Sequence, residues 1–150
     1  MNQLEQPGAR PDPLAEQHAY DELQGYTLSR GDPTFVHQHI VDAWAAQHAD
    51  SSSKPMELAF ALVGLYLHVD RGFTGRQVQR IHTVLSQRSR NWPSFPLPSE
   101  RGAVTALDVV AAPAGPRRDQ AIDAWCASVW NAFSVSHRPV AELLDQHGIG

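Results

Sequence analysis

The chain has 150 residues, of which 42% are hydrophobic and 19% charged, and this composition is typical of a single globular domain. The formal net charge of −4 argues against a general nucleic-acid binder, and the single cysteine, Cys126, cannot form an internal disulfide. The first twenty residues lack the basic start and apolar core of a signal peptide, and the apolar run 59–67 is too short to span a membrane. We therefore expect a cytoplasmic protein without a membrane span.

The N-terminal segment, residues 1–15, contains three prolines and no helical periodicity, so we expect a flexible tail in front of one domain over residues 16–150. Tyr20, Leu23 and Leu28 then indicate a short first helix within residues 16–28. A turn at residues 30–33 follows, with Asp32 or Thr34 capping the next element.

The segment 34–48 reads as an amphipathic helix with two separate histidine positions. Its broad apolar face contains Val36, Ile40, Ala43, Trp44 and Gln47. His37 follows the edge of that face, as does His48, whereas His39 and Asp42 lie on another side at a spacing that lets them touch.

The central element is residues 54–70, because its run 59–67 has no charged residue and would have to be covered on most sides. Pro55 behind three serines indicates a helix start, and the length excludes a typical strand. The short polar linker 49–53 predicts that this helix packs antiparallel to the preceding one. Ala61 and Gly64 would then allow close approach of a neighbour on the stripe that ends at His68.

The rest of the chain continues the helical pattern around a rigid, proline-rich loop at residues 91–98, whose apolar side chains should pack back on the domain. No segment reads as a convincing strand. We expect an all-α single-domain bundle of four main helices plus one or two short ones, and the helices still to be placed cover residues 75–90, 105–112, 117–133 and 139–146.

Eight histidines are the unusual feature of the composition, and they suggest a site for a divalent metal such as zinc or iron. Antiparallel packing would place His68 beside His37 and His39, with Asp42 moving protons or orienting an imidazole. Further ligands could come from later helices, so the candidate metal ligands are His37, His39, His68, His82 and His137. No HExxH motif is present, and a buried histidine bonded to a carbonyl is the competing interpretation for each.

A second candidate site is basic. Arg71, Arg76 and Arg80 surround a predicted helix start, where guanidinium and backbone N–H groups could bind an anion, although a solvated helix face is the commoner role. Cys126 lies on the apolar stripe of residues 117–133, which favours an inert buried thiol over a nucleophile.

Three sequence blocks carry a family resemblance: HQHIVDA from residue 37, LYLHVDRGFTGRQVQ from residue 65 and AWCASVW from residue 124. With their surroundings they cover most of residues 19–145, and the chain resembles a bacterial family catalogued only as a domain of unknown function. The resemblance implies no reaction, although the candidate histidines and Asp42 fall within its recognisable blocks.

Two functions therefore stay open. One is a small metalloenzyme, in which the histidine-bound metal activates water or a substrate carbonyl of a small molecule. The other is a non-enzymatic module that binds an anionic ligand or a protein partner through the face Arg71 to Arg90, with structural histidines. Either can be a homodimer, and the sequence does not decide whether the protein is an enzyme.

Overall fold

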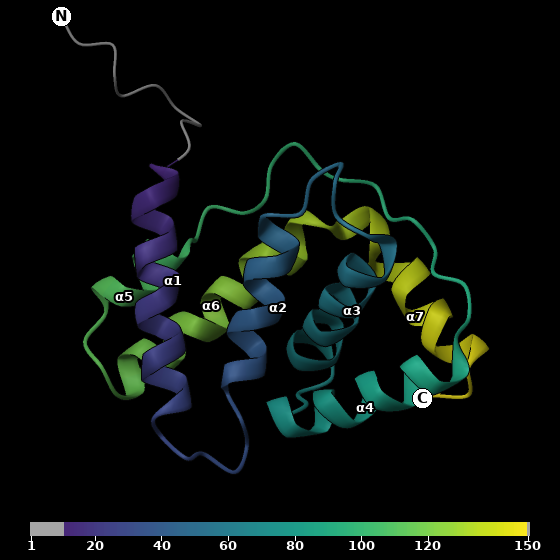
Figure 1. Ribbon diagram of the computed structural model, residues 1–150, viewed down its shortest axis with the longest axis horizontal. Helices are drawn as coiled ribbons and strands as arrows, with labels where there is room; N and C mark the ends of the chain where they lie inside the picture. The colour runs from purple at the N-terminus through teal and green to yellow at the C-terminus, as the bar shows by residue number, and fades with distance from the viewer. Residues whose placement is uncertain (1–10, 150) are drawn as a thin grey trace, which may run out of the picture.

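The computed structural model describes residues 11–149 and is built from helices, with no strand in that range (Figure 1). The expected all-α class is confirmed, and residues 11–149 form seven α-helices, one in each of the seven segments expected to be helical. The elements are α1 (Pro13–Leu28), α2 (His37–Gln47), α3 (Pro55–Leu65), a π-helix η1 (Tyr66–Asp70), α4 (Gly75–Arg88), α5 (Ala106–Ala111), α6 (Pro116–Ala132), a 3-10 turn η2 (Ser134–Ser136) and α7 (His137–Gln146).

The predicted central helix lies at the middle of the fold, in contact with α2, α4, α6 and α7. Pro55 occupies its first turn, as the sequence indicates, and its uncharged run is buried from Leu58 to Leu65 except for Phe60. The α-helix does not continue to Asp70, because the last five residues of the segment widen into the π-helix η1. π-helical turns are rare and often occur at functional sites, and this one carries His68.

Helix α2 packs antiparallel to α3, as predicted from the short linker. His39 in the first turn of α2 stacks on His68 beyond the end of α3, and one turn further along α2 the Asp42 carboxylate lies directly over Gly64. A Cβ atom at position 64 would lie 1.9 Å from Asp42 Oδ2, so only glycine leaves room for this carboxylate. The small-residue stripe on α3 therefore receives a polar side chain rather than an apolar ridge.

The start of α2 differs from the prediction by three residues. Phe35, the second residue of the expected helix 34–48, has a φ of 55° that interrupts this helix, and Asp32 caps the turn by accepting hydrogen bonds from Thr34. Gly75 then packs against the Phe35 carbonyl, which a Cβ atom would meet at 1.8 Å. The first turn of α4 thus packs against the turn that precedes α2.

Helix α1 is longer than the predicted 16–28, since it begins at Pro13 with Asp12 accepting a hydrogen bond from the Ala15 N–H. Residues 13–15 of the expected tail are therefore helical, and residues 1–10 of that tail lie outside the described range. The side chain of Tyr20 stacks on Trp44 with a centroid distance of 4.3 Å, which joins α1 to α2.

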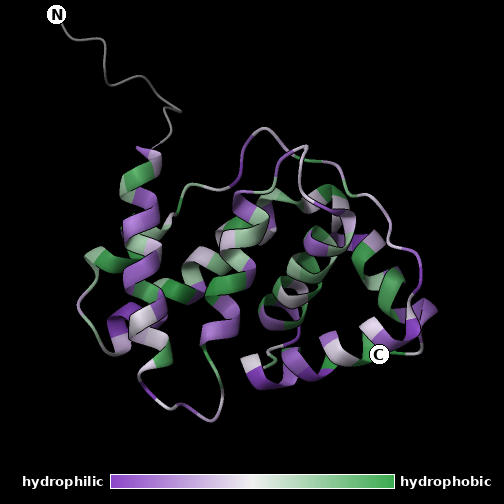
Figure 2. Ribbon diagram, in the orientation of Figure 1, coloured by the Kyte–Doolittle hydropathy of each residue, from purple (hydrophilic) through white to green (hydrophobic). Residues whose placement is uncertain are grey.

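The outer elements follow the sequence pattern more closely. Thr74 caps α4 as expected, and Figure 2 shows a largely hydrophilic α4 ribbon beside the more hydrophobic centre of the fold. In the proline-rich loop, Phe95 is buried and Trp92 packs edge-on against Phe60, whereas Leu97 is 39% exposed and does not pack back as predicted. Within residues 11–149, no helix has the length and hydropathy needed to cross a membrane.

Candidate functional site

The structure brings together two of the five predicted metal ligands, His39 and His68. Their rings stack with centroids 3.5 Å apart and planes inclined by 17°. His39 is buried, with an exposed fraction of 5%, while His68 lies closer to the surface. This contact follows from the antiparallel packing of α2 on α3, which the short linker 49–53 predicted.

His68 is bonded through both ring nitrogens. Its Nδ1 lies 3.2 Å from the Phe73 carbonyl oxygen, and its Nε2 lies 2.9 Å from Oδ1 of Asp123 on α6. A carbonyl and a carboxylate are both acceptors, so a neutral imidazole can donate to only one of them and the imidazolium form donates to both. Asp123, whose side chain is 66% exposed, is a site residue that the sequence analysis missed.

Two buried polar atoms beside this pair have no hydrogen-bond partner among the described residues: His39 Nδ1 and Asp42 Oδ2. Burial and the neighbouring His68 lower the pKa of His39 to about 3, so the ring is neutral. Burial raises the pKa of Asp42 well above its ordinary value, and Gln38 Nε2 donates to its other oxygen over 3.0 Å. Asp42 therefore tends to be an uncharged acid.

The buried thiol of Cys126 closes this region from α6. Its Sγ lies 3.5 Å from the backbone carbonyl of His39, and burial followed by the nearby Asp42 raises the thiol pKa well above its ordinary value. A thiol in such surroundings stays protonated and is a poor nucleophile. The interpretation of Cys126 as a packing residue is consistent with this geometry.

The other three predicted ligands are held elsewhere by their own hydrogen bonds. His37 Nδ1 lies 2.9 Å from the Thr27 hydroxyl, His82 Nε2 lies 2.8 Å from the Phe60 carbonyl, and His137 Nε2 lies 2.7 Å from the Trp130 carbonyl. Across residues 11–149, no group of three or more His, Cys, Asp or Glu side chains is arranged to hold a metal ion. The five histidines therefore do not share one centre.

The predicted anion-binding arginines, Arg71, Arg76 and Arg80, are exposed, but the helix start between them offers few free donors. The Thr74 and Gln77 N–H groups are bonded in a reciprocal cap, and the Arg76 N–H donates to the Thr34 carbonyl over 2.9 Å. The Arg76 guanidinium lies 5.0 Å above the Phe35 ring and donates to Gln79. These contacts favour the solvated-face interpretation of the basic residues.

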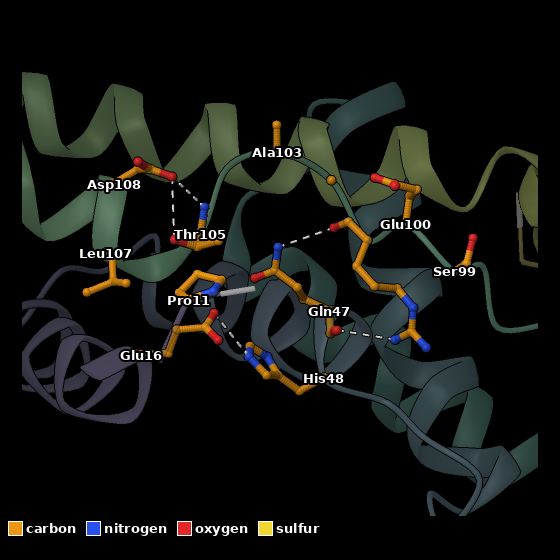
Figure 3. A pocket seen from close by; sticks show the side chains of 12 residues that line it. Pro11, Glu16, Gln47, His48, Ser99, Glu100, Ala103, Thr105, Leu107 and Asp108 are labelled. Atoms are coloured by element: carbon orange, nitrogen blue, oxygen red, sulfur yellow. Dashed lines mark hydrogen bonds and ion pairs between the residues drawn. The ribbon is translucent and has the colours of Figure 1, made fainter. Parts of the chain in front are cut away.

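A cavity of about 600 Å³ opens at the other end of α2, between α1, α2 and the segment 98–108 (Figure 3). Its lining is about equally polar and apolar, and it contains more carboxylates than cationic groups. The lining residues are Pro11, Glu16, Gln47, His48, Ser99, Glu100, Arg101, Gly102, Ala103, Thr105, Leu107 and Asp108.

One wall of this cavity is a buried carboxylate paired with an exposed imidazole. Glu16 Oε2 lies 3.3 Å from His48 Nε2, and Figure 3 shows the two side chains pointing toward each other. His48 Nδ1 lies 3.0 Å from the Trp44 carbonyl, and the ring stacks on Trp44. The imidazole is thus fixed from two sides with its Nε2 edge toward the carboxylate.

The opposite wall is fixed to α2 through Gln47. The buried Gln47 amide donates to the carbonyls of Arg101 and Val104 over 3.2 and 2.8 Å, and its oxygen accepts from Trp125 Nε1 over 2.9 Å. Helical periodicity predicted Gln47 on the core face, but neither Glu16 nor the 98–108 wall was predicted. A signal that points to Gln47 is an amide on an otherwise apolar face, because a buried amide needs polar partners.

We expect Gln47→Leu to lower the free energy of unfolding by about 2 kcal/mol, because it leaves the Trp125 indole N–H and two carbonyls without their partner. Hydrogen exchange should also quicken in residues 99–105, which the amide holds to α2. Urea unfolding and exchange mass spectrometry measure the two effects, and Gln87→Leu at an exposed position of α4 is the matched control. Unchanged exchange in residues 99–105 would contradict the anchoring role.

Comparison with known proteins adds a family but no activity. Neither the curated proteins nor the solved structures contain a match to this chain. A family model described as a family of unknown function, DUF5946, matches residues 10–134, and this range includes the whole of α1 to α6. The chain therefore belongs to this family of unknown function, as the HQH, GRQVQ and AWC blocks suggested.

Proposed function

We propose that the protein binds a small organic cation in the cavity between α1, the end of α2 and residues 98–108. The observation that carries the proposal is the cavity itself, with a volume of about 600 Å³ that falls within the range of small-molecule sites. The protein would thus be a non-enzymatic binding module, which is the second of the two functions expected from the sequence. Its ligand would be a cation in this cavity rather than an anion on the face Arg71 to Arg90.

The charge of the ligand follows from the lining. The lining contains three carboxylates, those of Glu16, Glu100 and Asp108, and one guanidinium, that of Arg101. The guanidinium already donates to backbone carbonyls of Pro98, Ala46, Gln47 and Ala49. Carboxylates in a partly enclosed site attract cations more strongly than they do in open water. Pro11 and Leu107 add apolar contact for the carbon skeleton of an organic ligand.

The buried Glu16 is the residue expected to contribute most. Its carboxylate is already oriented by His48, so little side-chain freedom is lost when a ligand binds. An anionic ligand on Arg71, Arg76 and Arg80 has less support, because the N–H groups of Thr74, Arg76 and Gln77 at that helix start are already bonded within the protein. The proposal includes a cytoplasmic location, which the free thiol of Cys126 supports.

Calorimetric titration and thermal shift with agmatine, which carries a guanidinium and an ammonium group, test the proposal. We expect one molecule to bind per chain with a dissociation constant below about 1 mM and to raise the melting temperature. Glu16→Gln, which keeps the shape of the side chain, should weaken binding about tenfold, whereas Glu22→Gln on the same helix should leave it unchanged. Succinate, an anion of similar length, should not bind.

Two results would overturn the proposal. One is an absence of binding for agmatine and for spermidine at millimolar concentration by the folded protein. The other is equal affinity of wild type and Glu16→Gln, which would place the ligand outside this cavity.

A further inference from the structure

The pair formed by His68 and Asp123 lies at the end of α2 opposite the cavity, and it has the features of a metal-ligand pair. The geometry points to one divalent transition-metal ion bound by His68 Nε2 and an Asp123 carboxylate oxygen, with water in the remaining coordination positions. This inference is independent of the proposed cavity ligand and assigns no reaction.

The spacing of the two donor atoms fits a shared ion. Imidazole nitrogen and carboxylate oxygen bind zinc at about 2.0–2.2 Å, so neighbouring ligands at octahedral or tetrahedral angles lie about 2.8–3.5 Å apart. His68 Nε2 and Asp123 Oδ1 are 2.9 Å apart, and they come from the π-helix η1 and from α6.

The other ring nitrogen of His68 is held as in known metal sites. Metal-bound histidines usually donate their second N–H to a carbonyl or carboxylate, which fixes the tautomer and the direction of the lone pair. Here Nδ1 faces the Phe73 carbonyl at 3.2 Å, a contact made possible by the break after η1. With the proton on Nδ1, the Nε2 lone pair points toward Asp123.

His39 supports this ring without sharing the ion. A metal lies in the plane of each imidazole that binds it, and nearly parallel rings 3.5 Å apart have planes that do not meet at one ion. The buried ring of His39 instead covers the face of His68 away from solvent, while its own Nδ1 has no partner among the described residues. The exposed carboxylate of Asp123 leaves the other side open to water.

The donor set indicates the class of metal. One neutral imidazole and one carboxylate suit cobalt, nickel, copper and zinc better than calcium or magnesium, which prefer oxygen ligands alone. Only two protein ligands predict an affinity well below that of a structural zinc site. His37, His82 and His137 have no part in it.

The test uses full-length protein purified without a histidine tag and freed of metal by chelation. Cobalt(II) absorption and calorimetric zinc titration should show one ion per chain with a dissociation constant below about 1 mM. His68→Gln and Asp123→Asn should each weaken binding about tenfold or more, whereas His18→Gln at the surface of α1 should not. His39→Phe, which keeps the stacked ring, should change the affinity less than about threefold.

Melting curves of each metal-free variant show that it is folded before its affinity is compared. The inference is overturned if the wild type binds no ion below about 1 mM, or if folded His68→Gln or Asp123→Asn binds as tightly as wild type. It is also overturned if folded His39→Phe loses the ion, because the stacked ring would then be a ligand.

Discussion

Gly64→Ala should lower the free energy of unfolding by about 3 kcal/mol or more, the upper part of the range for overpacked cores. The new Cβ would lie 1.9 Å from Asp42 Oδ2 and 2.5 Å from its Cγ, distances that no pair of such atoms can keep. Because Asp42 is buried between α2 and α3, its side chain cannot swing into solvent, so the two helices must separate. Urea unfolding at constant pH measures the change.

The control is Gly25→Ala in α1, an exposed helical position where an added Cβ meets nothing within 4 Å. There alanine should stabilise the protein by about 0.5–1 kcal/mol, since glycine is the weaker helix former. Adding Asp42→Ala to Gly64→Ala removes the carboxylate that the new methyl group meets, and should restore part of the loss. A destabilisation that is the same with and without Asp42 would contradict the steric explanation.

Asp42→Asn should make the protein more stable than wild type at neutral pH, and the difference should grow with pH. Burial raises the folded-state pKa of Asp42, so the folded protein keeps a proton that the unfolded chain releases above its ordinary pKa near 4. The stabilisation that the protonated Asp42 carboxyl group contributes to the wild type is therefore fully present below about pH 4. It decreases as the pH rises toward the folded-state pKa, by up to about 1.4 kcal/mol per pH unit. Asparagine does not titrate, so it removes this loss.

Unfolding free energies of both proteins between pH 4 and pH 8 test this sign directly. The amide oxygen that the Asp42→Asn substitution introduces can still accept from Gln38, so the variant should keep the wild-type contact at low pH. Asp145→Asn, at an exposed position of α7, is the matched control and should follow wild type at every pH. If the Asp42→Asn and wild-type curves are parallel over this range, Asp42 is not protonated by folding.

Much of the fold was predictable because the strongest patterns in the chain are local. The uncharged run 59–67 and Pro55 defined α3, and the linker 49–53 was too short for anything but an antiparallel neighbour. The start of α2 was predicted wrongly because Phe35 adopts a positive φ, which its residue type gives no reason to expect. The change from α-helix to π-helix at the end of the central segment was not predicted either, because the sequence of η1 has no feature that distinguishes it from an α-helix.

The candidate sites were predictable only in part. His39 and His68 were paired correctly because their contact depends on one linker, whereas Asp123 meets His68 only through the packing of α6, which no local pattern gives. The same holds for Glu16 and His48, which come from α1 and the end of α2. Histidine number was a poor guide to metal ligands, because three of the five expected ligands are held by carbonyl or hydroxyl groups elsewhere.

Arg101 gives the end of α2 an unusual dependence on distant sequence. Its guanidinium donates to the carbonyls of Ala46, Gln47 and Ala49, groups that helices ordinarily satisfy with a local cap or with water. On a chain emerging from the ribosome, these carbonyls would gain their final partner only after residue 101 has been synthesised. The last turn of α2 should therefore mature late, together with the segment that follows the proline-rich loop.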